Sequence, residues 1–86
     1  MCHLDRLRFE LRLASDAWRQ EAEYTAVLLE KLMLAGEVDQ ERVLLQMRAE
    51  DDAMRHYQHT RALYRHTAME KISALTGVAR TSARVN

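Results

Sequence analysis

Proline is absent from this chain of 86 residues, and glycine occurs only twice. That scarcity argues against a collagen-like repeat, a disordered low-complexity chain or a β fold rich in turns, because each of these uses proline, glycine or both. Hydrophobic residues make up 48% of the chain and charged residues 30%. The composition is therefore that of one small globular domain with a thin core, and helix is the expected secondary structure.

Cysteine is equally scarce. Cys2 is the only one, so no internal disulfide is possible, a cysteine-rich zinc module does not fit, and a reducing compartment is favoured. The opening stretch, MCHLDRLRFELRL, carries a charge every two or three positions and lacks the apolar run of a signal peptide. No stretch approaches the roughly 18 apolar residues of a membrane span. We therefore expect a cytoplasmic protein without a membrane segment, with Cys2 as a free thiol.

Neither sign of charge is in excess, since 13 basic residues balance 13 acidic ones. No overall field draws the chain to nucleic acid or to anionic lipid. The balance is uneven along the sequence, however, because only Glu70 is acidic after residue 60 while five residues there are basic. The C-terminal end is therefore basic.

Apolar residues recur at alternating spacings of three and four over residues 4–35, which predicts one long amphipathic helix. Ser15 and Asp16 could cap a new helix ahead of Trp18, but without glycine or proline there we expect a continuous helix. The expected seam, with two polar members, is Leu4, Leu7, Leu11, Ala14, Trp18, Glu21, Thr25, Leu28, Leu32 and Ala35. A second apolar row, expected to widen the buried stripe, is Phe9, Leu13, Ala17, Tyr24, Val27 and Leu34.

A short connection over residues 36–38 follows, in which Gly36 supplies a left-handed helix end and Asp39 caps the next helix. A second helix is expected over about 39–76, ending before Gly77. Short connections make long helices antiparallel neighbours, so we predict an all-α hairpin over residues 1–77 and a basic, frayed tail over 78–86. The predicted seam of the second helix is Val43, Met47, Glu50, Met54, Tyr57, Arg61, Tyr64, Ala68, Lys71 and Leu75.

A lone pair of helices covers only one side of each apolar stripe, so the hairpin is expected to need a partner. A homodimeric four-helix bundle would supply one, and so would the helices of another protein. Polar seam residues would then either set the register and partner choice or lie in water at the edge of the stripe. The side chains that we predict to bind the partner are Leu28, Leu32, Leu45, Met47, Met54, Tyr57, Leu63 and Tyr64.

Acids and histidines are concentrated in EDDAMRHYQHTRALYRH, residues 50–66. Asp52, His56 and His59 fall within an arc of about 60° around a helix, a spacing that suits zinc or iron. In outline the chain resembles the helical hairpins of ferritin-like di-iron proteins, which imply a Glu-x-x-His pair on one helix. Ala53 stands where that glutamate is required, and this face points away from the predicted core. We therefore expect no cofactor and interpret the face as solvated, with metal binding as an alternative.

The end of the chain, ISALTGVARTSARVN, looks like the helix-turn-helix of lactose-repressor-type regulators. Ile72, Gly77 and Val78 match its buried and turn positions. The resemblance implies contacts with phosphates or bases from Arg80, Thr81, Ser82 and Arg84. The residues do not supply the third helix of a full module. For this alternative we therefore expect nonspecific, salt-sensitive binding of nucleic acid.

No glycine-rich phosphate loop and no nucleophile placed beside a base is present, so we predict a protein that is not an enzyme. The layout, with LLEKL before a short turn, is similar to the plasmid copy-number hairpin that dimerises and binds RNA loops. It is equally similar to the small co-chaperones of type III secretion needle subunits. The leading prediction is a noncatalytic adaptor, co-chaperone or regulator; a nucleic-acid-binding regulator and a metal-binding bundle follow as alternatives.

Overall fold

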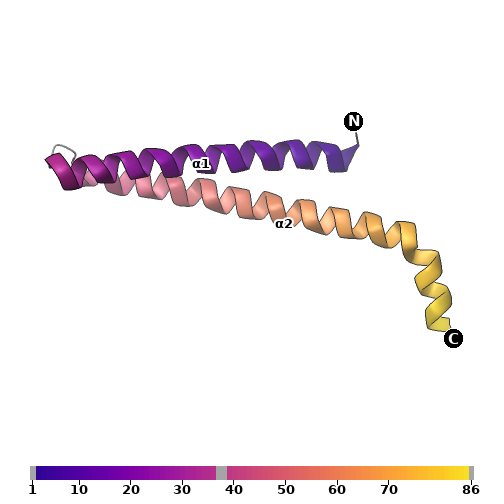
Figure 1. The fold of residues 1–86 in the computed structure, drawn as a ribbon. Helices are drawn as coiled ribbons and strands as arrows, with labels where there is room; N and C mark the ends of the chain where they lie inside the picture. The colour runs from indigo at the N-terminus through magenta and orange to yellow at the C-terminus, as the bar shows by residue number, and fades with distance from the viewer. Residues whose placement is uncertain (1, 37–38, 86) are drawn as a thin grey trace.

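Over the residues that it describes, the computed structural model contains two antiparallel helices connected by a short segment (Figure 1). It describes residues 2–36 and 39–85, with the surroundings of side chains described as far as Thr76. Helix α1 spans His3–Ala35 and helix α2 spans Gln40–Val85. The predicted all-α hairpin is therefore confirmed.

Helix α1 passes Ser15 and Asp16 without interruption. Gly36 ends it with φ 62° and ψ 18°, a left-handed conformation that costs glycine little, and its N–H donates to the carbonyl oxygens of Leu32 and Lys31. Beyond the turn, Asp39 Oδ1 accepts a hydrogen bond from the Glu41 N–H at 3.1 Å, as a helix-capping carboxylate does. Residues 37 and 38, which belong to the predicted turn, lie outside the described residues.

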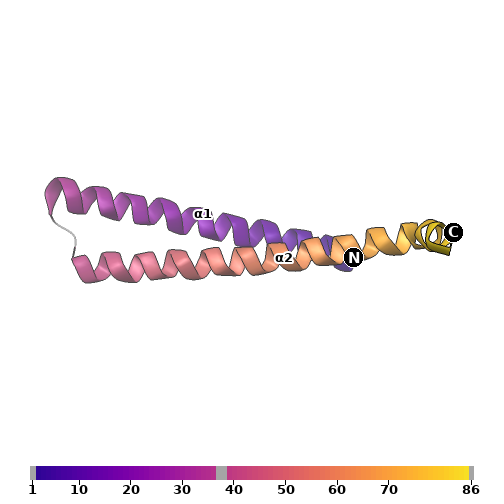
Figure 2. The same cartoon turned by 90° about the horizontal axis from the view of Figure 1, so that it is seen from below.

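The two helices wind around each other along their length. In the view of Figure 1 the two ribbons overlap near the turn and are apart at the open end. In the perpendicular view of Figure 2 they are apart near the turn and overlap toward the open end. Such winding is what a sustained seven-residue apolar repeat produces. Helix α2 reaches Val85 rather than ending before Gly77, and its last turns bend away from the rest of the hairpin (Figure 1).

The predicted seam of α1 faces α2. Leu7, Ala14, Thr25 and Leu28 are buried, and the remaining seam members from Leu4 to Leu32 are half-buried. Thr25 is accommodated in this apolar setting because its hydroxyl donates to the Glu21 carbonyl oxygen at 2.9 Å. The seven-residue repeat therefore predicts correctly which face of α1 packs against α2, except at Ala35, which is exposed.

The seam of α2 differs from the predicted one in part. Val43, Glu50, Tyr57 and Tyr64 are buried or half-buried as expected. Gln46 and Thr60 take the places predicted for Met47 and Arg61, whereas Ala53 and Thr67 are half-buried beside the predicted Met54 and Ala68. Met47 and Arg61 are exposed, Met54 and Ala68 are half-buried, and Lys71 and Leu75 are exposed. Small side chains in the seam allow the two backbones to approach closely.

The resulting molecule is a rod. Its extents are 69 × 29 × 16 Å and its radius of gyration is 20.5 Å, whereas a compact domain of this length has about 12 Å. The chain exposes 7104 Å² of surface, whereas a compact monomer of 10.1 kDa exposes about 5,300 Å². The hairpin therefore leaves more of its surface exposed than a compact monomer of the same mass would.

Candidate interaction surface

Polar and aromatic contacts fix the seam near its middle. The rings of Trp18 and Tyr57 stack with their centroids 5.3 Å apart and their planes inclined by 25°. Nearer the turn, Gln46 Nε2 donates to Glu21 Oε2 at 2.6 Å and to the Glu21 carbonyl oxygen at 3.2 Å. These half-buried groups are occupied within the hairpin, so they define the register of the two helices.

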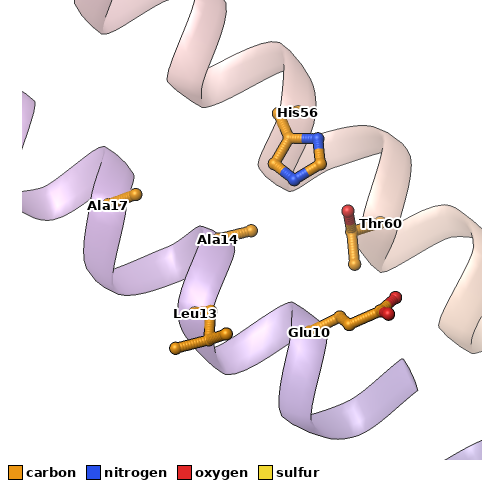
Figure 3. Close-up of a pocket in the computed structure, with 6 residues that line it drawn as sticks. All are labelled: Glu10, Leu13, Ala14, Ala17, His56 and Thr60. Atoms are coloured by element: carbon orange, nitrogen blue, oxygen red, sulfur yellow. The ribbon is translucent and has the colours of Figure 1, made fainter. Parts of the chain in front are cut away.

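A groove runs between the helices beside this seam, with a volume of about 510 Å³. Ala14 and Thr60, both buried, form its floor, while Leu13 and Ala17 from α1 and His56 from α2 form its walls (Figure 3). Glu10 lines the groove toward the open end of the rod. Because the floor is built from small residues, the groove can receive large side chains from outside the chain.

Exposed apolar side chains extend from the groove along both helices. Phe9, Ala17, Tyr24 and Val27 lie within about 40° of Leu13 around α1, at 100° per residue. On α2, Leu45 and Leu63 lie within about 20° of His56. All of these side chains are exposed. We call this surface the groove face; it comprises Phe9, Leu13, Ala17, Tyr24, Val27, Leu45, His56 and Leu63.

This α1 row was expected to widen the buried stripe, and the structure differs. Leu13 is 54% exposed and Val27 is 45% exposed. The reason is that α2 lies toward the other side of the α1 seam, where Ser15, Ala22 and Leu29 are half-buried. The apolar row is therefore exposed to solvent. Its regular spacing of three, four or seven residues is the sequence signal that could have identified it as a second apolar face of α1.

The opposite side of the hairpin is charged along the same stretch. A hollow of about 320 Å³ lies there beside Leu11 and Tyr57, and its rim carries Arg8, Arg12, Asp16 and Arg19. The rim of this hollow is charged, whereas the side chains that define the groove face are apolar apart from His56. Arg6, Gln20 and Lys31 lie on the same arc of α1 as the groove face.

The predicted partner-binding residues fall into three groups. Leu28 is only 3% exposed and belongs to the interior of the hairpin. Half-buried positions are occupied by Leu32, Met54, Tyr57 and Tyr64. Leu45, Met47 and Leu63 are exposed, and two of them, Leu45 and Leu63, lie on the groove face. The set thus combines residues of the internal seam with residues of the outer surface.

The candidate metal ligands Asp52, His56 and His59 are exposed on α2. Asp52 Oδ1 lies 4.0 Å from Arg55 Nη1, and His66 Nε2 lies 3.0 Å from Glu70 Oε1. Within the part of the chain that the structure describes, no three His, Cys, Asp or Glu side chains converge in a group that could hold a metal ion. The residues of the nucleic-acid alternative, Arg80, Thr81, Ser82 and Arg84, have side chains outside the described part.

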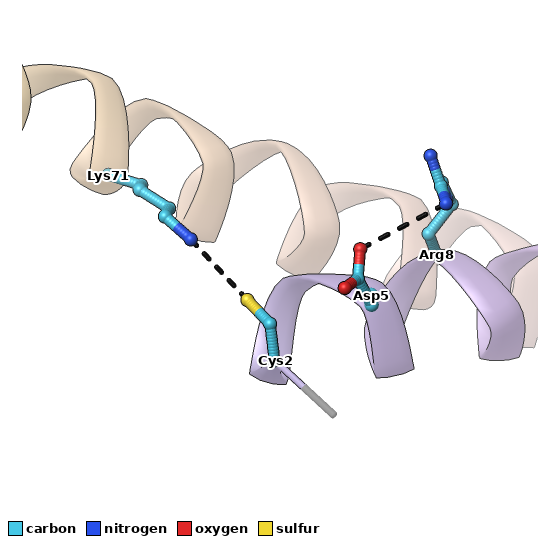
Figure 4. A network of polar contacts seen from close by, with 4 residues as sticks. All are labelled: Cys2, Asp5, Arg8 and Lys71. Carbon is cyan, nitrogen blue, oxygen red and sulfur yellow. Dashed lines mark hydrogen bonds and ion pairs between the residues drawn. The ribbon is translucent and has the colours of Figure 1, made fainter.

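At the open end of the rod, Lys71 Nζ lies 3.4 Å from Cys2 Sγ and links the two helices (Figure 4). Cys2 precedes the first turn of α1, although its side chain does not form a capping hydrogen bond. The backbone amides of Leu4 and Asp5, together with the Lys71 ammonium, lower the pKa of the exposed Cys2 thiol. The neighbouring ion pair, Asp5 with Arg8, is exposed and lies within α1.

Neither helix offers, in its described residues, an apolar run long enough to cross a lipid bilayer. Comparisons of the chain with protein-family models, with curated proteins and with solved structures find no match. The groove face and the seam beneath it are therefore interpreted from their own chemistry.

Proposed function

We propose that this protein is a noncatalytic interaction module, an adaptor, co-chaperone or regulator, that packs its apolar side against helices of another polypeptide. The product of that packing is a four-helix bundle, formed either with a second copy or with a helical partner. The cytoplasm is the compartment that we propose, because the single cysteine suits a reducing environment.

The observation that carries this proposal is the amount of apolar surface that the hairpin leaves uncovered. Among the described residues, the large apolar side chains that are buried are Leu7, Leu28 and Val43. Leucines, methionines and a phenylalanine are exposed along both helices. Monomeric proteins rarely expose contiguous apolar patches beyond a few hundred Å², and larger ones mark interaction sites. The uncovered side chains lie on rigid helices, which suits recognition by helix packing rather than by a loop.

Two resemblances in layout fit this proposal. The type III secretion co-chaperones pack a helical hairpin on a larger partner, and the plasmid copy-number protein dimerises through one. The likeness is one of architecture, and we transfer no functional residue from either family.

Thermal unfolding tests the proposal because association with the folded form raises its melting temperature. Helicity would be followed by circular dichroism over a hundredfold range of chain concentration, and then with purified candidate partners captured from the native cell. A melting temperature that rises with the concentration of the chain, or with an added partner, is the expected result. A melting temperature that changes in neither series would contradict the proposal.

A further inference from the structure

We infer that five exposed arginines, on the side of the rod opposite the groove face, bind the phosphates of a single strand of nucleic acid. The residues are Arg8, Arg12 and Arg19 of α1 and Arg61 and Arg65 of α2. We call this set the arginine face. The inference goes beyond the proposed function, because it assigns a different ligand to a different side of the hairpin.

Folding the chain back on itself separates charges that balance in the sequence. Among the described side chains, the half of the rod away from the turn, residues 2–20 and 53–76, carries eight lysines and arginines and four aspartates and glutamates, a net charge of +4. The half next to the turn, residues 21–36 and 39–52, carries three basic and eight acidic side chains, a net charge of −5. The rod is 69 Å long and the Debye length at physiological ionic strength is about 8 Å, so a polyanion at the basic half is screened from the acidic half.

The three arginines of α1 share one arc of the helix. At 100° per residue, Arg8, Arg12 and Arg19 lie within about 40° of one another and about 100° or more from Leu13 of the groove face. All three line the hollow of about 320 Å³ on that side of the hairpin. Their guanidinium groups therefore border one concave surface.

The two arginines of α2 lie on the same side of the hairpin. Tyr57 lines the hollow, and Arg61 follows it by one turn, about 40° further around α2. Arg61 and Arg65 are about 140° and 180° from His56, which lines the groove on the opposite side. Both arginines are exposed.

Contacts between the helices set the level of these arginines along the rod. Trp18 stacks on Tyr57, and Cys2 contacts Lys71 at the open end. By interpolation between these two contacts, the α2 arginines lie level with about residues 9–14 of α1. The arginine face therefore consists of two rows, one on each helix, that flank the seam.

Acidic side chains neutralise the arginine face only in part. Asp5, Asp16 and Glu23 lie on the same arc of α1, whereas residues 53–69 of α2 contain no acid. Among the described side chains, only Arg8 of the five arginines forms an ion pair, with Asp5 at 3.9 Å. Four guanidinium groups are therefore available to a ligand.

The chemistry of the hollow favours a single strand of nucleic acid. A guanidinium group donates two parallel hydrogen bonds to a phosphate, so the two rows can follow a phosphate backbone. Half-buried Leu11 and Tyr57 lie between the rows in the hollow. Surfaces that bind single strands combine a basic groove with apolar and aromatic contacts to bases, and bases are accessible in a single strand but stacked inside a duplex.

Fluorescence anisotropy with a labelled oligodeoxythymidylate of about 20 nucleotides tests the inference on the full chain, because this probe has bases but no duplex. Titrations between about 50 and 200 mM salt should give a slope of log K against log salt of about −3.5, the value for five neutralised phosphates on a single strand. The absence of binding at the lowest salt, or a slope near zero, would overturn the inference.

Two double variants remove the same charge from different sides of the basic half. Arg12→Gln with Arg61→Gln acts on the arginine face, and Arg6→Gln with Arg55→Gln is the control, in which each position lies about 120° away around its helix. The first should raise the Kd at about 50 mM salt by at least tenfold and make the slope shallower by about 1.4. The control should change the Kd by less than about threefold. Equal effects of the two would overturn the inference.

Circular dichroism would verify that each variant keeps its helicity. If the first variant loses it, Arg8→Gln with Arg65→Gln provides a second pair from the same face with the same expected result. The basic tail is tested by Arg80→Gln with Arg84→Gln. A loss of binding in the tail variant that exceeds the loss in the face variant would overturn the inference.

An acidic polypeptide is the competing ligand for a basic surface. At an equal concentration of negative charge, unlabelled oligodeoxythymidylate should displace the probe more effectively than poly-glutamate does. Equal or better displacement by poly-glutamate would overturn the inference and assign the arginine face to an acidic protein. The proposed function is tested separately, because its melting-temperature series contain no nucleic acid.

Discussion

Gln46 joins α2 to Glu21 of α1 at two points, through the carboxylate at 2.6 Å and the backbone carbonyl at 3.2 Å. Both side chains are half-buried in the seam. A polar pair at this depth contributes less to stability than apolar packing would, but it is satisfied in only one alignment of the helices. The register of the hairpin therefore depends on this contact.

Replacing Gln46 by alanine should lower the free energy of unfolding by about 1–2 kcal/mol, because the Glu21 carboxylate loses a half-buried donor. Urea denaturation of this variant, of Glu21→Ala and of the double variant would give the coupling between the two residues. A coupling close to zero would show that the hydrogen bonds do not hold the register.

The Trp18–Tyr57 stack should contribute through its rings rather than through the phenol hydroxyl. Tyr57→Leu is expected to cost about 1 kcal/mol, and Tyr57→Phe much less, because phenylalanine keeps the aromatic face. Trp18 is the only tryptophan, so its fluorescence reports directly on this contact during unfolding. Equal losses in the two variants would assign the effect to something other than stacking.

Gly36 should tolerate substitution poorly even though a Cβ atom there would meet nothing within 4 Å. The cost comes from the backbone, since φ 62° is unfavourable for residues with a Cβ. Gly36→Ala is expected to lower the free energy of unfolding by about 1 kcal/mol, and Gly36→Asn by less. Thermal denaturation compares the two, and an unchanged alanine variant would mean that the turn adopts another conformation.

Alkylation of Cys2 should reveal its lowered pKa. The midpoint of the rate against pH should lie lower in the folded chain than in urea, because unfolding removes the ordered amides of Leu4 and Asp5 and the contact with Lys71. Lys71→Gln should move the folded midpoint upward by part of the difference. Lys31→Gln, which removes a lysine near the turn, is the control and should leave the midpoint unchanged. Identical midpoints in folded and unfolded chains would contradict this account.

The sequence predicts the hairpin well because two strong signals agree in it. A regular seven-residue repeat sets the α1 seam, and Gly36 with Asp39 sets the turn. The α2 seam is ambiguous because Val43, Glu50, Tyr57 and Tyr64 fit two registers equally well. Hydrophobicity favours the register with Met47 and Met54 between them.

The folded hairpin places Gln46 and Thr60 in the seam where Met47 and Arg61 were predicted, while Ala53 with Met54 and Thr67 with Ala68 are half-buried alike. Close approach of the helices and hydrogen bonds across the seam decide between the two registers, and neither can be read from one helix alone. The same choice leaves Leu45 and Leu63 on the outside, so the candidate surface could be only partly predicted.

The central claim is that the folded hairpin needs a second polypeptide to cover its apolar side. Its most direct test is the mass of the folded species, measured by sedimentation equilibrium at concentrations where circular dichroism shows full helicity. We predict a mass of two chains or more, either for the protein alone or after a purified helical partner is added. A fully helical species that unfolds cooperatively and sediments at 10.1 kDa, the mass of one chain, both alone and with every partner added would contradict the claim.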